Sequence, residues 1–300
     1  MKKTLIALAV LAASGAAMAQ STVTISGVLA YGWQNSGGTK GTTRTDGNVN
    51  FSAVEDLGGG LKATATAGVD LANRGQFAAG RNWTLGLSGD FGSLSMGTAN
   101  ANLSSRLGDA GGTIALDKNI DDIYGSDVNL QVVNYTAPKF GNLTVGITWN
   151  GAAGSALTQD AAAVAPGKIT SASGDIAASY AIDGGNVVLT YRPEDRRVRY
   201  GVNYTLSGVS FGAHMVPEYT AYSTGSVVAA QTEFEAWMPL GALTIGAQTG
   251  KRDTAKGTAF GAKYALSKRT SVTASFAKIN TGSQTSSAAT QQRIKLQHSF

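Results

Sequence analysis

Hydrophobic and polar residues alternate along most of this chain with a period of two. In residues 81–90, Trp83, Leu85 and Leu87 fall on one face, and small or polar residues fall on the other. This period is the pleat of a strand that contacts an apolar phase on one side and water on the other. A tight turn joins this run to a second one, residues 91–100. The pattern therefore predicts a β-hairpin that is not part of an ordinary core.

The alternation recurs along the chain, and its connections differ in length. Short turns rich in glycine, asparagine and aspartate alternate with long polar segments at 35–46, 101–127, 151–172 and 280–290. Short turns at one end and long loops at the other are typical of an all-β, transmembrane antiparallel barrel, most simply one of about sixteen strands. The predicted strands are residues 23–33, 48–57, 61–71, 81–90, 91–100, 128–137, 143–150, 176–182, 187–192, 198–206, 209–219, 231–238, 243–252, 259–266, 270–279 and 292–300.

The first nineteen residues have the pattern of a secretory signal peptide. Lys2 and Lys3 precede a short apolar run at residues 5–13, and Ala17 and Ala19 form a small-x-small cleavage site. The apolar run is shorter than the about 20 residues that a membrane-spanning helix needs, which disfavours an uncleaved anchor. We therefore expect cleavage after residue 19 and a single barrel domain over residues 20–300.

The composition favours a barrel with a wet interior. Charged residues make up 14% of the chain, and 39 glycines stand against 5 prolines. The chain has no cysteine, which excludes disulfides and thiolate metal sites, and we expect no metal or other cofactor. A β-sandwich is the alternative, but it would not need long loops on one side only. Aromatic residues near the predicted strand ends suit the girdles of a membrane barrel: Tyr31, Trp33, Tyr135, Trp149, Tyr191, Tyr219 and Phe300.

Five segments resemble a known family. Residues 54–63 (VEDLGGGLKA) are similar to the second hairpin of the general porins of β-proteobacteria and Neisseria, and residues 86–92 with Gly97 resemble the next hairpin. Residues 134–141 and 264–270 resemble two more hairpins, and residues 298–300 are similar to the terminal aromatic signal for outer-membrane assembly, which assigns that role to Phe300. Thr98 departs from the family, which usually carries arginine there.

The resemblance implies a Gram-negative outer-membrane channel. It implies sixteen strands, a homotrimer, contact with outer-membrane lipid and lipopolysaccharide, and passive diffusion of inorganic ions and small hydrophilic solutes with a slight anion preference. It also implies that the long third loop of the barrel, residues 101–127, folds into the lumen and narrows it.

Strand parity predicts which charged residues face the lumen, because a charge facing lipid at mid-depth costs about 2–4 kcal/mol. Lys62 and Lys295 lie near the short turns, where they line either the constriction or only the exit. Arg192 and Arg199 flank residues 193–197, where a salt-bridge network is the alternative to solute steering. The full inward set is a basic wall of Lys62, Arg192, Arg199, Lys263 and Lys295, with Asp70, His214, Glu218, Glu233 and Glu235.

The third long loop is acidic. It carries five aspartates against Arg106 and Lys118. An acidic loop opposite a basic wall would create a transverse field at the narrowest section, which orients water and dipolar solutes. The predicted constriction residues are Asp109, Asp117, Asp121 and Asp122.

Other functions have little support in the residues. A serine-type hydrolase needs a histidine base, and the chain has only His214 and His298, with no nucleophile motif near either. Its glycines punctuate strands and do not open helices, so we expect no nucleotide-binding loop and no nucleic-acid partner. The main hypothesis is a diffusion channel. The alternatives are a channel selective for a small organic acid or sugar, disfavoured for sugars because Trp237 is the only large aromatic placed inward, and a structural barrel with a plugged lumen.

Overall fold

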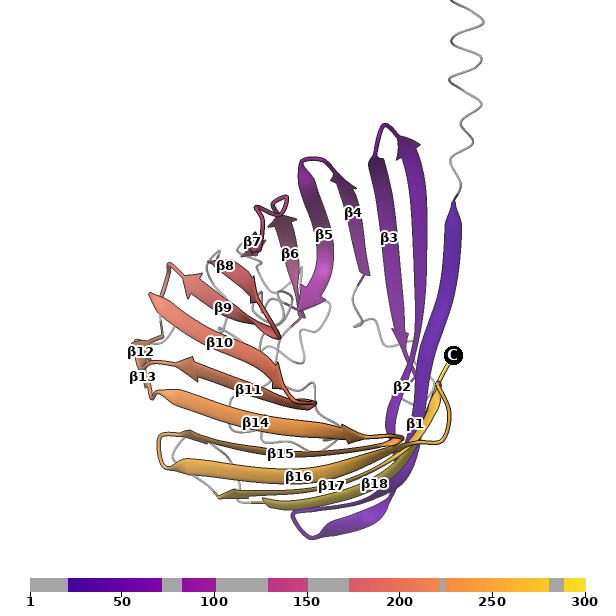
Figure 1. The fold of residues 1–300 in the computed structure, drawn as a ribbon, viewed down its shortest axis with the longest axis vertical. Coiled ribbons are helices and arrows are strands. Elements are labelled where there is room, and N and C mark those ends of the chain that lie inside the picture. The colour runs from indigo at the N-terminus through magenta and orange to yellow at the C-terminus, as the bar shows by residue number, and fades with distance from the viewer. Residues whose placement is uncertain (1–20, 72–82, 101–128, 151–172, 222–224, 281–288) are drawn as a thin grey trace, which may run out of the picture.

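The protein is a closed antiparallel β-barrel of sixteen strands in the computed structural model (Figure 1). The structure describes residues 21–71, 83–100, 129–150, 173–221, 225–280 and 289–300. Consecutive strands are neighbours, and a small hairpin, β12–β13, lies outside the barrel sheet. The barrel strands are β1 (Thr22–Ser36), β2 (Thr39–Gly58), β3 (Leu61–Asp70), β4 (Trp83–Gly89), β5 (Gly92–Asn100), β6 (Asn129–Thr136), β7 (Leu143–Asn150), β8 (Ser173–Ile182), β9 (Gly185–Arg192), β10 (Arg197–Leu206), β11 (Val209–Val216), β14 (Gln231–Leu240), β15 (Leu243–Arg252), β16 (Ala255–Ala265), β17 (Thr270–Asn280) and β18 (Ala289–Ser299).

The barrel closes where β1 pairs with β18. The pairing runs from Val28 opposite Ser299 to Ser36 opposite Gln291. Phe300 extends it, since the backbone N–H groups of Gly27 and Phe300 donate to each other's carbonyl oxygens at 2.9 and 3.0 Å. A Cβ on Gly27 would lie 2.5 Å from the backbone oxygen of Asn48 on β2 and 2.5 Å from the Phe300 ring, so the barrel seam favours glycine at position 27.

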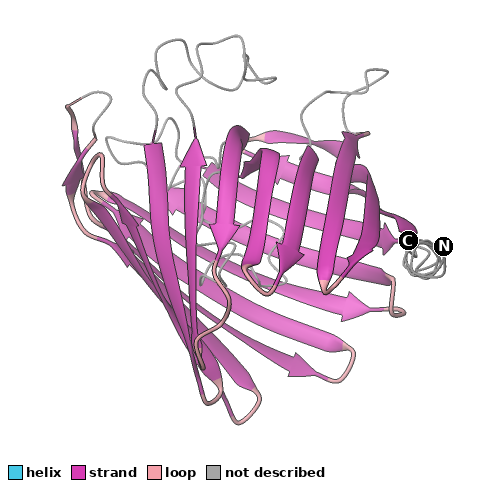
Figure 2. Ribbon diagram, turned by 90° about the horizontal axis from the view of Figure 1, so that it is seen from above, coloured by secondary structure: helices cyan, strands magenta, loops and turns pink. Residues whose placement is uncertain are grey.

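The connections follow the predicted asymmetry. Figure 2 shows short turns gathered at one end of the barrel, and Gly58–Gly60 and Asp183–Gly184 are among them. The segments between β3 and β4, β5 and β6, β7 and β8, and β17 and β18 leave the opposite end. We call these ends the turn end and the loop end. The predicted sixteen-stranded barrel is confirmed.

Two predicted boundaries are wrong. Residues 35–46, expected as a loop, continue β1 and β2 around a turn at Gly37 and Gly38, whose φ angles are 58° and 92°. The β-branched threonines of this segment favour strand, and the two glycines supply the left-handed conformation that a two-residue turn needs.

The strand expected to run to residue 219 ends at Val216. Pro217 follows and has no backbone N–H to donate. Tyr219–Thr220 (β12) instead pairs with Val227–Val228 (β13), and Glu218, expected inside the lumen, lies exposed in this connection. Glu218 is therefore not on a barrel strand, where the prediction placed it.

The two faces of the barrel differ as the alternation predicts. Large apolar side chains cover the outer face, and Ile25, Leu85 and Phe234 are 57–58% exposed. The inner face is polar, and Thr148 and Gln248 are buried within the concave wall. Among the described residues, no helix is long and apolar enough to cross a membrane. The apolar outer face is suited to lipid, since every strand backbone is paired around the closed barrel.

Candidate pore wall

Three of the predicted basic residues lie on the inner face near the turn end. Lys263 of β16 and Lys295 of β18 both lie directly opposite Thr273 of β17, which is buried. Lys62 of β3 lies opposite Asp56 of β2. The Asp56 carboxylate also accepts a hydrogen bond from the Gly58 N–H at 2.9 Å, so this acid has a second, structural role at the turn.

Arg192 lies at the loop end of β9 and is held in an ion pair. Its Nε donates to Asp175 Oδ1 at 2.6 Å and its Nη2 donates to Oδ2 at 2.9 Å. The Asp175 side chain is 2% exposed, whereas that of Arg192 is 25% exposed. Nearby, Glu194 accepts a hydrogen bond from the Gly174 N–H at 2.7 Å. The structure therefore places Arg192 in a salt-bridge network, and it places Arg199 on the inner face of the adjacent strand, opposite Thr190.

The Glu233 carboxylate contacts side chains of the two neighbouring strands. Glu233 of β14 is 2% exposed, and its carboxylate lies 3.5 Å from His214 Nε2 on β11. Gln248 of β15 donates a hydrogen bond to the same carboxylate. Glu235 lies above Gly212, where a Cβ would come within 2.5 Å of Glu235 Oε1. The Glu235 side chain occupies the space that a side chain at position 212 would need.

Both histidines of the chain lie on barrel strands. His214 is buried against Glu233 within the wall. His298 lies on the outer face near the turn end, with its Nδ1 2.9 Å from Thr270 Oγ1.

Three further arginines face inward and were missing from the sequence-based set. Arg293 Nη2 donates to Gln34 Oε1 at 2.7 Å across the closing strand pair. Arg252 lies opposite Gln231, and Arg197 lies opposite Arg192. The alternation along the strands could have identified two of them, because residues an even number apart share a face. Arg293 is two residues from Lys295, and Arg252 is four residues from Gln248.

With these additions, the charge of the described inner wall can be counted. Within the barrel strands that the structure describes, eight basic residues face inward against six acidic ones. The basic set is Lys62, Arg192, Arg197, Arg199, Arg252, Lys263, Arg293 and Lys295 and the acidic set is Asp46, Asp56, Asp70, Asp175, Glu233 and Glu235. The wall carries a small positive excess.

The predicted constriction lies outside the described residues. Asp109, Asp117, Asp121 and Asp122 all fall between β5 and β6, within residues 101–128. Phe300 is placed, and its ring covers Gly27 on the outer face of the barrel seam. Its role as an assembly signal stays a prediction.

A closed barrel that is apolar outside and charged inside defines a membrane-spanning channel of the outer-membrane type. The sequence agrees: a family model described as Gram-negative porin matches residues 4–284. The chain belongs to this family, which places it in the Gram-negative outer membrane and points to a channel rather than an enzyme. The predicted resemblance to porins is confirmed.

Individual proteins support the same family. "Outer membrane porin protein 32" of Delftia acidovorans is 44% identical over 112 residues, which cover 32% of this chain and 31% of that protein. The match thus spans about a third of that relative's length.

Solved structures resemble the fold over nearly the whole chain. An anion-selective porin from Comamonas acidovorans aligns with a TM-score of 0.71 at 18% identity and covers 94% of this chain and 100% of that one. OmpT from Vibrio cholerae, in its trimer form, aligns with a TM-score of 0.69 at 12% identity and covers 93% and 99%. At these identities the likeness concerns the fold.

Proposed function

We propose that the protein is a water-filled outer-membrane channel through which ions and small hydrophilic solutes diffuse passively. The observation that carries this proposal is the inner wall, where polar and charged residues face inward from strand after strand of a closed barrel. Such a lining favours water and hydrated solutes, whereas apolar solutes must displace ordered water.

A slight preference for anions is part of this proposal, and the charge of the described wall has the same sign, whereas the proposed acidic loop, with five aspartates against Arg106 and Lys118, opposes it. The wall's described strands carry two more basic than acidic residues, and Lys263 and Lys295 lie on the strands that flank Thr273. The acids Asp175 and Glu233 are buried and engaged with Arg192 and His214, so they attract passing cations less than exposed carboxylates would. The name of the Comamonas acidovorans relative, an anion-selective porin, supports the same sign. The preference stays small because both charge signs line the lumen.

The functional unit is proposed to be a homotrimer surrounded by outer-membrane lipid and lipopolysaccharide. The similar fold of OmpT, solved as a trimer, supports this assembly. The exposed apolar outer face also needs a partner, either lipid or a second copy, over most of its area. Asp109, Asp117, Asp121 and Asp122 are proposed to narrow the lumen of each copy.

A channel selective for a small organic acid is the second candidate. The lysines at positions 263 and 295 favour it, since two ammonium groups at one level of the wall can attract a carboxylate. A sugar-selective channel has less support, because Trp237 is the only large aromatic residue that faces inward from the described barrel strands.

Swelling of proteoliposomes in solutes of graded size separates these functions. A general channel admits neutral sugars and organic anions at rates that fall smoothly with solute size. An organic-acid channel would admit one anion far faster than a sugar of equal size, and a Lys263→Gln/Lys295→Gln variant would lose that advantage. Absence of swelling with a folded barrel would contradict both channel functions.

A further inference from the structure

The charged residues on the outer face are distributed unevenly. On the described barrel strands, five basic residues face outward and all lie toward the loop end, whereas the single acidic one, Glu55, lies near the turn end. The basic residues are Lys40, Arg44, Lys251, Lys256 and Lys278. A lysine facing lipid is tolerated only near the membrane interface. These positions therefore mark the level of the headgroups at the loop end.

Three of these lysines are clustered on neighbouring strands. Lys251 of β15 lies directly opposite Lys256 of β16, and Lys278 of β17 lies opposite Thr258, two residues from Lys256. All three side chains are exposed. We call them the lysine triad. Like charges directly opposite each other repel, and Asp253 in the adjoining turn supplies one carboxylate against three ammonium groups. The triad therefore favours an external anion.

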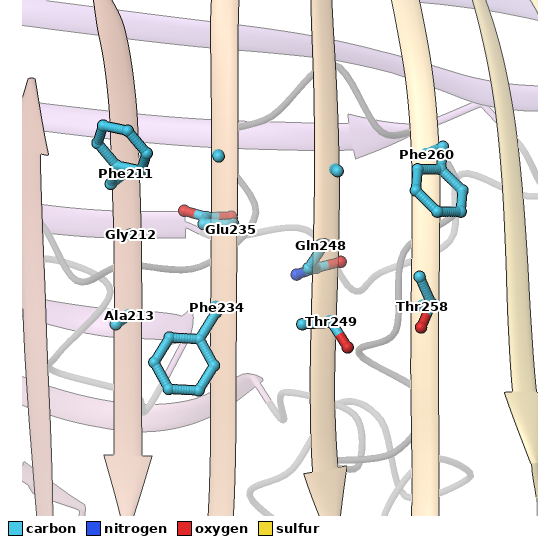
Figure 3. A pocket seen from close by; sticks show the side chains of 11 residues that line it. Phe211, Gly212, Ala213, Phe234, Glu235, Gln248, Thr249, Thr258 and Phe260 are labelled. Atoms are coloured by element: carbon cyan, nitrogen blue, oxygen red, sulfur yellow. The ribbon is translucent and has the colours of Figure 1, made fainter.

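An apolar groove lies on the same outer face, over β11, β14, β15 and β16 (Figure 3). Phe211, Phe234 and Phe260 stand around it, and small side chains, including Ala213 and Thr249, form its floor. The three rings are 45–57% exposed. The groove has a volume of about 490 Å³, within the range of small-molecule pockets, and is open toward the outside of the barrel. Its form suits an acyl chain better than a flat apolar wall would.

The groove and the triad are continuous. Thr249 and Lys251 are two residues apart on one face of β15, and Thr258 and Lys256 have the same relation on β16. This spacing is about 7 Å along a strand. The triad thus stands at the loop end of the groove, so that one ligand can place an apolar tail against the phenylalanines and an anionic group against the lysines.

We propose that this surface binds lipopolysaccharide of the outer leaflet, with a lipid A phosphate on the lysine triad and an acyl chain in the groove. The inference rests on the proposed function, since it requires an outer-membrane barrel whose loop end faces outward. A second copy of the chain is a poorer occupant. Its described outward-facing charges are basic except for Glu55 at the turn end, so it offers no complementary charge at this level.

Binding of purified trimer in detergent to lipid A tests the role of charge. The variant is Lys251→Gln/Lys256→Gln/Lys278→Gln, and the control, Lys139→Gln/Lys268→Gln/Arg269→Gln, removes the same charge at the turn end. Each lysine near an anionic lipid surface contributes about a fivefold factor in affinity, so the triad variant is expected to bind on the order of a hundredfold more weakly. The control and wild type should bind alike, and dephosphorylated lipid A should not distinguish the triad variant from wild type. Equal affinity of both variants for lipid A would overturn the proposal.

A photo-crosslinking residue at position 234 tests the occupant of the groove. In outer membranes it is expected to crosslink to lipopolysaccharide, and Phe260→Ala should reduce the yield severalfold more than Leu189→Ala, which removes an outward side chain on distant β9. A crosslink to a neighbouring protomer in place of lipid would overturn the proposal. Conductance should be unchanged in the triad variant, so loss of lipid binding and failure of the channel function are separate results.

Discussion

The ion pair between Asp175 and Arg192 gives a quantitative test of the inner wall. Asp175→Asn keeps the size of the side chain and removes its charge, whereas Arg192→Gln removes the guanidinium. Removing one partner of a buried ion pair costs about 3–5 kcal/mol. The cost depends on which charge is left without its partner, and the two partners differ in exposure, at 2% for Asp175 and 25% for Arg192.

The two substitutions should therefore have unequal effects. Arg192→Gln leaves a buried carboxylate and is expected to lower the free energy of unfolding by about 3–4 kcal/mol. Asp175→Asn leaves a guanidinium that water reaches, with Glu194 and Asp195 in the next turn, and is expected to cost about 2 kcal/mol. The double variant should cost less than the sum of the two, with a coupling of about 1.5–3 kcal/mol.

Equilibrium unfolding of the barrel in lipid vesicles, followed by the fluorescence of its four tryptophans, measures these free energies. Asp183→Asn is the matched control, because Asp183 is exposed in the turn at the other end of the same β8–β9 hairpin. It should change stability by less than about 0.5 kcal/mol. If Asp175→Asn proved more destabilising than Arg192→Gln, or if both matched the control, the reasoning from burial would be refuted.

Three further predictions concern the basic residues of the inner wall, the closure of the barrel between β1 and β18, and the screening of the lumen charges by salt. Lys263→Gln/Lys295→Gln is expected to lower the anion-to-cation permeability ratio with little change in conductance, and an unchanged reversal potential would contradict a role for this level. Gly27→Val should prevent closure against Phe300, so that electrophoresis without heating shows little folded barrel. Gly41→Val, where a Cβ has open space, should fold normally, and equal folding of both would rule out the steric argument. Raising ionic strength from 0.1 to 1 M shortens the screening length from about 10 to 3 Å, so permeability ratios measured at the two concentrations should move toward unity; a constant ratio would indicate selection by size.

The sequence predicted the barrel and the faces of its strands because both depend on local pattern. Lys62, Lys263 and Lys295 could be placed on the inner face from the apolar residues on either side of them. The same parity applies to Arg252 and Arg293, which the predicted set omitted. The boundary at 35–46 failed because a threonine-rich polar segment resembles a loop in composition, although its residues favour strand.

Contacts between strands could not be derived in the same way. Asp175 and Arg192 are 17 residues apart, and their pairing depends on the register that the turn at Asp183 and Gly184 sets. The carboxylate of Glu233 meets His214 and Gln248 from two different strands, which requires the register of β11, β14 and β15 together. The surface that joins the lysine triad to the phenylalanine groove likewise exists only after five strands, β11 and β14 to β17, are aligned.

Single-channel recording of the purified protein in a planar bilayer, with the reversal potential measured under a salt gradient, tests the central claim most directly. The account predicts stepwise insertions in groups of three, high conductance, and a reversal potential whose sign shows weak anion preference. A folded barrel that gave no conductance would contradict the channel itself, and a clear cation preference would contradict the assigned role of the basic wall.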